Sequence, residues 1–125
     1  MKILIVDDIK GWRDYHSAII KEFYPETEIY TAESAKDGYD KLLENNEKPF
    51  DIIITDMQME NNFEPKYAGE WFIEQIKTFK NYINTKIIII SAAYNIQHIA
   101  NNYGVKFIRK SSARNFPEIY KEYIC

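Results

Sequence analysis

The sequence predicts one α/β domain over residues 1–125, in which five parallel strands alternate with helices. Three observations support this fold class. Five short β-branched runs are spaced through the whole chain. Three of the runs are continuously apolar, which is typical of strands buried on both faces of a parallel sheet. The segments between them carry apolar residues at intervals of three and four, as amphipathic helices do. We therefore expect a (βα)5, doubly wound unit with right-handed crossovers.

The expected strands are the apolar runs themselves. In chain order they cover residues 3–6, 29–31, 52–54, 87–90 and 105–108. The runs at 3–6, 52–54 and 87–90 contain no polar residue, so we expect them at the centre of the sheet.

The expected helices are recognised by their apolar stripes and their end signals. The first carries its stripe from Ile9 to Phe23, and Pro25 ends it. The second opens with Ser34, with Asp37 three residues later, close to a capping box. The third runs from about Gly69 to Tyr82. The fourth has Asn95 as its N-cap and Gly104 just past its end. The last begins at Arg114 or Pro117 and ends at Ile124.

Composition excludes several classes of protein. Hydrophobic residues make up 46% and charged residues 28%, which is ordinary for a globular domain. The net charge of −3 is unlike that of a domain that grips nucleic acid by its phosphates, so we expect no direct nucleic-acid contact. No apolar run is long enough to span a bilayer, and the single cysteine, Cys125, has no partner for a disulfide. We expect a cytoplasmic protein without membrane contact.

Chemically active side chains follow four of the five expected strands. Asp7 and Asp8 follow the first strand, Asp56 the third, Ser91 the fourth and Lys110 the fifth. Ligands of open α/β sheets bind at the carboxyl ends of the strands, so these residues should converge on one edge. Two carboxylates about 4 Å apart repel by about 4 kcal/mol at an effective dielectric near 20, so three need a cation. Such a set of carboxylates fits Mg²⁺, with the lysine and the hydroxyl available to a phosphoryl group.

Four motifs, in this order and spacing, resemble the response-regulator receiver domain of two-component signalling. They are Ile-Leu-Ile-Val-Asp-Asp at 3–8, Ile-Ile-Ile-Thr-Asp-Met at 52–57, Ile-Ile-Ile-Ile-Ser-Ala at 87–92 and Phe-Ile-Arg-Lys at 107–110. The resemblance covers essentially the whole chain and is closest to the chemotaxis-regulator type. It implies a flavodoxin-like sheet in strand order 2-1-3-4-5, with helices on both faces.

The resemblance also implies roles for individual residues. Asp56 is at the position of the phospho-acceptor. Asp8 would bind Mg²⁺ directly, Asp7 through water, and Gln58 through its backbone carbonyl. Lys110, Ser91 and Phe107 stand at the positions of the family's lysine, its Ser/Thr switch and its aromatic switch. Phosphorylation would move Ser91 and let Phe107 turn inward. We expect the resulting conformational change to alter a surface that includes Tyr94, Ile99, Tyr103 and Tyr120.

The same resemblance implies a phosphorylation-dependent switch rather than an enzyme. Its partners would be a sensor histidine kinase or phosphotransfer protein and a downstream output domain or target. A homodimer through the fourth helix, fifth strand and fifth helix is also implied. No output domain is recognised in the sequence, which fits a stand-alone regulator as well as a receiver from a longer protein.

Three features depart from the family pattern. Ser111 follows the lysine where a proline is usual, and Glu60 stands where a proline often follows the acceptor by four residues. The glycine that normally opens the third helix is Gly69, displaced by an insertion, so the connection from 57 to 68 is about twice the usual length.

Two other functions stay open. One is a receiver-like interaction module that acts without phosphorylation, and the other is a Mg²⁺-dependent phosphohydrolase on the same scaffold. Each site residue also has an ordinary structural explanation on its own: a helix N-terminus for Asp7 and Asp8, a turn for Asp56, a solvated surface for Lys110. We expect His16 to be half-buried with a hydrogen-bond partner, and His98 to face solvent.

Overall fold

One parallel sheet of five strands forms the centre of the molecule. A computed structural model describes residues 1–59 and 67–125. The strand order is β2-β1-β3-β4-β5, which confirms the expected fold class. The strands are β1 (Lys2–Val6), β2 (Glu28–Ala32), β3 (Ile52–Thr55), β4 (Lys86–Ser91) and β5 (Lys106–Arg109). The three continuously apolar runs are β1, β3 and β4, and they occupy the middle of the sheet, as predicted.

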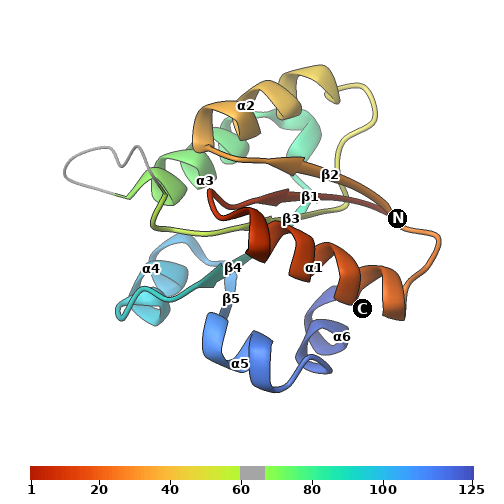
Figure 1. Ribbon diagram of the computed structural model, residues 1–125. Helices are drawn as coiled ribbons and strands as arrows, with labels where there is room; N and C mark the ends of the chain where they lie inside the picture. The colour runs from red at the N-terminus through yellow and green to blue at the C-terminus, as the bar shows by residue number, and fades with distance from the viewer. Residues whose placement is uncertain (60–66) are drawn as a thin grey trace.

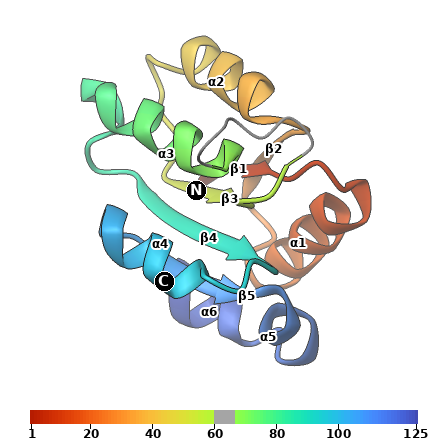
Figure 2. The same ribbon diagram turned by 90° about the vertical axis from the view of Figure 1, so that its left-hand side faces the viewer.

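Helices cover both faces of this sheet (Figures 1 and 2). They are α1 (Lys10–Phe23), α2 (Ala35–Glu44), α3 (Ala68–Thr78), α4 (Ile96–Tyr103), α5 (Lys110–Asn115) and α6 (Ile119–Ile124), with a 3₁₀ turn η1 (Lys80–Tyr82). Side chains alternate along each strand, so each face has its own core. Leu4, Val6 and Ile53 pack with α2, α3 and α4. Ile3 and Ile5 pack on the opposite face, with α1, α5 and α6.

The predicted helix ends are largely confirmed. The Ser34 side chain accepts a hydrogen bond from the Asp37 amide at 3.0 Å and so caps α2. The Asp37 carboxylate accepts from the Glu33 amide instead of the Ser34 amide, so the capping box is incomplete. Gly104 ends α4 in the left-handed region, with φ 65°, where a side chain would be strained. Asn95 is the N-cap of α4, but its side chain makes no capping bond.

Two expected helices differ from the structure. The last helix was predicted to begin at Arg114 or Pro117, but α5 begins at Lys110 and a second helix, α6, follows. The break is at Phe116, which leaves the helical conformation because the next residue is a proline. The third helix ends at Thr78 because Phe79 leaves the helical conformation, and the chain continues as η1. No helix among residues 1–59 and 67–125 is long and apolar enough to cross a membrane.

Candidate functional site

The carboxyl ends of β1 and β3 bring three aspartates together. Val6 and Thr55 are in register on these neighbouring strands, and the Asp56 amide donates to the Val6 carbonyl at 3.0 Å. Asp7 and Asp56 therefore leave the sheet side by side. Carboxylate oxygens of Asp7, Asp8 and Asp56 all lie within 4.8 Å of one another, and in the described part of the chain no other acidic, His or Cys side chains form such a group.

Lys110 supplies the cation of this cluster. It directly follows β5 and is the first residue of α5, and the residue is only 7% exposed. Its ammonium Nζ lies 3.0 Å from Asp7 Oδ2 and 3.1 Å from Asp56 Oδ2. A buried charge is tolerated when it is paired, so the lysine and the two acids stabilise one another. The structure thus brings Lys110 to the acids, as the strand-end argument predicted.

Asp7 is the most buried of the three acids. Its Oδ1 accepts a hydrogen bond from the Ile9 amide at 2.9 Å. Its Oδ2 is buried and has no partner with hydrogen-bond geometry among residues 1–59 and 67–125, although the Lys110 ammonium is in ion-pair contact with it. Burial first, and the neighbouring Asp56 carboxylate second, raise the pKa of Asp7, while the Ile9 amide and Lys110 oppose the rise. A second cation at this oxygen would relieve both effects.

Asp56 is held by the backbone on one side and by Lys110 on the other. Its Oδ1 accepts from the Met57 amide at 2.7 Å, and its Oδ2 accepts from Lys110. The start of α3 presses against the same strand end. A Cβ added to Gly69 would collide with the Asp56 carbonyl oxygen and lie 2.7 Å from Met57 Cα. Only glycine permits this close approach, which explains the glycine that the sequence placed at this helix.

Ser91 and Phe107 lie on the strands next to this cluster. Ser91 ends β4 and is fully buried, and its Oγ accepts from the Ala93 amide at 3.1 Å. Phe107 on β5 is half-buried against the α4 side of the core. The Arg109 guanidinium lies 5.8 Å from its ring centroid.

The structure describes some, but not all, of the loop residues to which the sequence analysis assigned a role or a departure from the family pattern. Gln58 is exposed, close behind Asp56. Ser111 is exposed in the first turn of α5, so the helix begins where the family usually has a proline. Glu60 lies outside the described residues, as does most of the connection from 57 to 68.

Three expectations about burial are wrong. Ile99 and Tyr120 were predicted on a switch surface, but both are in the core, with exposures of 3% and 1%. Ile99 lies on the face of α4 that packs on the sheet, and Tyr120 reaches inward from α6. His16 is fully buried instead of half-buried, because its Nδ1 is 2.6 Å from the Tyr120 hydroxyl. His98 is exposed, as predicted, as is Tyr94.

Two side chains of α1 are neighbours of the site. The sequence places Trp12 four residues after Asp8 and so predicts a tryptophan near the acids, whereas sequence reasoning missed Arg13. The Arg13 guanidinium donates to the Asp7 carbonyl at 2.7 Å and so holds the end of β1. Trp12 places its ring 5.0 Å from the Lys110 ammonium. Both residues follow the aspartates by about one helical turn. The Lys110 partner of Trp12 is 98 positions away in the chain, so no local sequence pattern predicts that contact.

Comparisons with known proteins agree on one family. The model of the "Response regulator receiver domain" matches residues 3–115. A search of curated proteins gives no match. Among solved structures, a response regulator receiver domain protein from Clostridium thermocellum is 26% identical, with a TM-score of 0.69 over 87% of this chain and 81% of that chain. A CheY-like receiver domain protein from Methanospirillum hungatei is 25% identical, with a TM-score of 0.69 over 97% and 90%. The response regulator TrrA from Thermotoga maritima, solved in complex with Mg²⁺-BeF, shares the fold at 24% identity, with a TM-score of 0.75 over 97% and 94%.

Proposed function

This chain belongs to the response regulator receiver domains, and we propose that it is switched by transfer of a phosphoryl group to Asp56. Receiver domains are signalling switches rather than enzymes that turn over a substrate. The observation that carries the proposal is the position of Asp56 beside two further carboxylates and one buried ammonium group. We take the unit to span residues 1–125, because Tyr120 and Ile124 of α6 complete the core under α1.

Asp56 is the acid that we assign as the nucleophile, because its Oδ2 is the carboxylate oxygen that is hydrogen-bonded to Lys110. Its Oδ2 would attack the phosphorus of a phosphohistidine on a histidine kinase or phosphotransfer protein. The P–O bond forms as the P–N bond breaks, and the imidazole leaves with the bonding electron pair, which gives an aspartyl phosphate. The Met57 amide, 2.7 Å from Oδ1, keeps the carboxylate oriented during this step.

The acids fit a magnesium ion. Three carboxylates within 4.8 Å, with a buried Asp7 oxygen that no described residue hydrogen-bonds, form an environment of hard oxygen donors. Asp8 would bind the ion directly, Asp7 through water and Gln58 through its backbone carbonyl. Bound Mg²⁺ would neutralise the charge that accumulates on the phosphoryl oxygens.

Lys110 and Ser91 would recognise the phosphoryl oxygens. The Lys110 ammonium already touches Asp56 Oδ2 and can pair with an oxygen attached there. The Ser91 hydroxyl uses a lone pair to accept from Ala93, so its proton remains available for donation. Engagement of Ser91 would vacate space for Phe107 to turn inward, which would alter the surface around α4 and β5 that a target, an output domain or a second copy contacts.

The deciding experiment is phosphorylation with acetyl phosphate and Mg²⁺, followed by intact mass and peptide mapping. We expect one phosphoryl group, on Asp56, and none in Asp56→Asn. Asp51→Asn is the matched control, because Asp51 is exposed at the other end of the same strand. Modification that persists in Asp56→Asn would refute the assignment, and no modification of the wild type would favour an interaction module that acts without phosphorylation.

The metal assignment has its own test. Mg²⁺ should quench the fluorescence of Trp12, whose ring contacts Lys110, and Asp8→Ala should abolish this response. An unchanged Mg²⁺ affinity in Asp8→Ala would contradict the assignment of Asp8.

A further inference from the structure

Lys110 has a third neighbour besides its two aspartates. Its Nζ lies 5.0 Å from the centroid of the Trp12 ring, within the range of a cation–π interaction. Of its two carboxylate contacts, only the one with Asp56 has hydrogen-bond geometry. Among the described residues, Asp56 is thus the acceptor of its one hydrogen bond, and Asp7 and Trp12 are its other two contacts.

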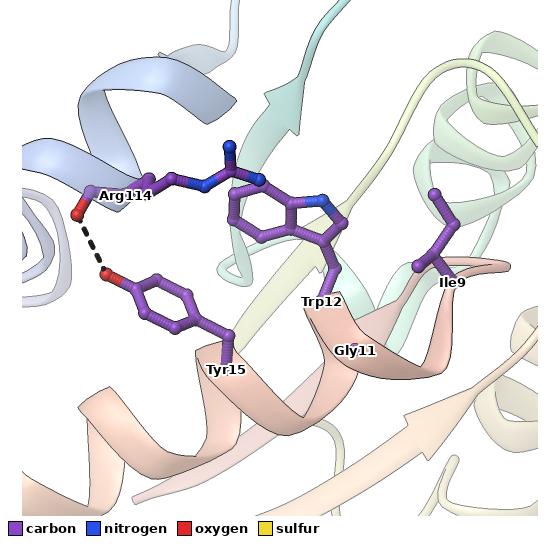
Figure 3. A pocket seen from close by; sticks show the side chains of 5 residues that line it. All are labelled: Ile9, Gly11, Trp12, Tyr15 and Arg114. Atoms are coloured by element: carbon purple, nitrogen blue, oxygen red, sulfur yellow. Dashed lines mark hydrogen bonds between the residues drawn. The ribbon is translucent and has the colours of Figure 1, made fainter.

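The Trp12 ring is itself held in place by its neighbours. Tyr15 contacts it edge-on, with centroids 5.6 Å apart, and the His16 ring is 5.4 Å away. The Tyr15 hydroxyl donates to the Ala113 carbonyl at 2.9 Å, which ties α1 to α5, the helix that begins with Lys110. Figure 3 shows the indole beneath the Arg114 guanidinium, beside a pocket of about 320 Å³ between these helices.

The ring differs from the acids in one chemical respect. A metal ion at the aspartates would compete with Lys110 for carboxylate oxygens, whereas the face of an indole is not a ligand of Mg²⁺. A metal at the acids would therefore leave the Trp12 face available to the Lys110 ammonium. Tryptophan is also the side chain whose ring attracts cations most strongly.

From this geometry we propose that Trp12 is a positioning residue, which holds the Lys110 ammonium toward Asp56 during phosphoryl transfer. The inference rests on the proposed function and adds a residue to it. A cation–π contact in a partly desolvated site corresponds to a factor of about three to thirty in a rate constant. We expect Trp12→Leu to lower the maximal rate of phosphorylation about tenfold and Trp12→Phe, which keeps a smaller ring, about threefold.

The test compares these variants by saturation kinetics with acetyl phosphate at saturating Mg²⁺, with intact mass as the readout. A positioning role predicts a lower maximal rate, an unchanged half-saturating phosphodonor concentration and an Mg²⁺ affinity within twofold of wild type. The matched control is Trp71→Leu, because Trp71 is also half-buried but lies on α3, where it packs near Tyr39. This control should keep the wild-type rate.

A second readout does not depend on activity. The indole should shield the ε-methylene protons of Lys110, so their NMR signals should lie upfield in the wild type, less so in Trp12→Phe and not in Trp12→Leu. Equal rates in all three proteins, or the same rate loss in Trp71→Leu, would overturn the inference while leaving the proposed function intact. A wild type that shows the shielding but takes up no phosphoryl group would overturn the proposed function itself. If Trp12→Leu does not fold, the intermediate rate and shift of Trp12→Phe decide the question.

Discussion

Acid should weaken the fold through one buried histidine. His16 is 1% exposed on α1, with its Nδ1 2.6 Å from the Tyr120 hydroxyl. Burial raises the pKa of Tyr120, so its hydroxyl keeps its proton and satisfies Nδ1 of a neutral imidazole, as donor or as acceptor according to the tautomer. His16 is therefore neutral in the folded protein. Burial, and next the charge of Lys110, lower the pKa of His16 from 6.5 to about 3.

The size of the stability loss follows from the two pKa values of His16, 6.5 in the unfolded chain and about 3 in the folded protein. Between pH 6.5 and about pH 3 the unfolded chain binds a proton at His16 that the folded protein does not. The free energy of unfolding therefore falls as the pH falls, by about 1.4 kcal/mol per pH unit within this window. From pH 7 to pH 4 the loss amounts to about 3 kcal/mol, which is a large share of the 5–15 kcal/mol typical of a small domain.

The assay is urea unfolding at a series of pH values from 4 to 8, for the wild type and for His16→Asn. Asparagine cannot be protonated here, and its carbonyl oxygen can accept from Tyr120 near the position of Nδ1. The loss of the imidazole ring lowers the stability of the variant at every pH. The informative quantity is therefore the change in the free energy of unfolding with pH. We expect the variant to lose about 3 kcal/mol less than the wild type between pH 7 and pH 4.

His98→Asn is the matched control, because it makes the same substitution at an exposed histidine. The raised pKa of Asp7 acts with the opposite sign, since it makes the fold more stable as acid is added. Asp7 is present in all three proteins, so its effect cancels in the comparison. Parallel stability curves for the wild type and His16→Asn would refute the reasoning.

Three further predictions concern the site and are also checked by urea unfolding. Gly69→Ala should cost about 3 kcal/mol, because its Cβ would collide with the backbone of Asp56, whereas Gly11→Ala, with nothing within 4 Å of the new Cβ, should be neutral or slightly stabilising; equal effects would contradict the close approach. Lys110→Met should cost about 3–5 kcal/mol at pH 7, since it leaves buried acids without their cation, and Mg²⁺ should restore part of the loss; a variant as stable as wild type without metal would refute this. Asp7→Asn should raise stability at pH 7, because the pKa of Asp7 is raised and its ionised form is therefore disfavoured in the fold; the gain should shrink as the pH falls toward 4, and a gain that grows in acid would show the wrong sign.

Local patterns in the sequence account for the sheet and for the acidic edge. Continuous apolar runs place β1, β3 and β4 in the middle, because only a strand covered on both faces can omit polar residues. The convergence of Asp7, Asp56 and Lys110 follows once the strands are parallel, since their carboxyl ends then share one edge.

What the tertiary structure alone decided is the set of contacts between helices from opposite ends of the chain. The bond between His16 and Tyr120 joins α1 to α6, and the contact between Trp12 and Lys110 joins α1 to α5. An apolar stripe shows that these residues face the core but not which side chain each will meet. The same limit explains why Tyr120 was placed on the surface: a tyrosine is buried only where a distant partner such as His16 can satisfy its hydroxyl.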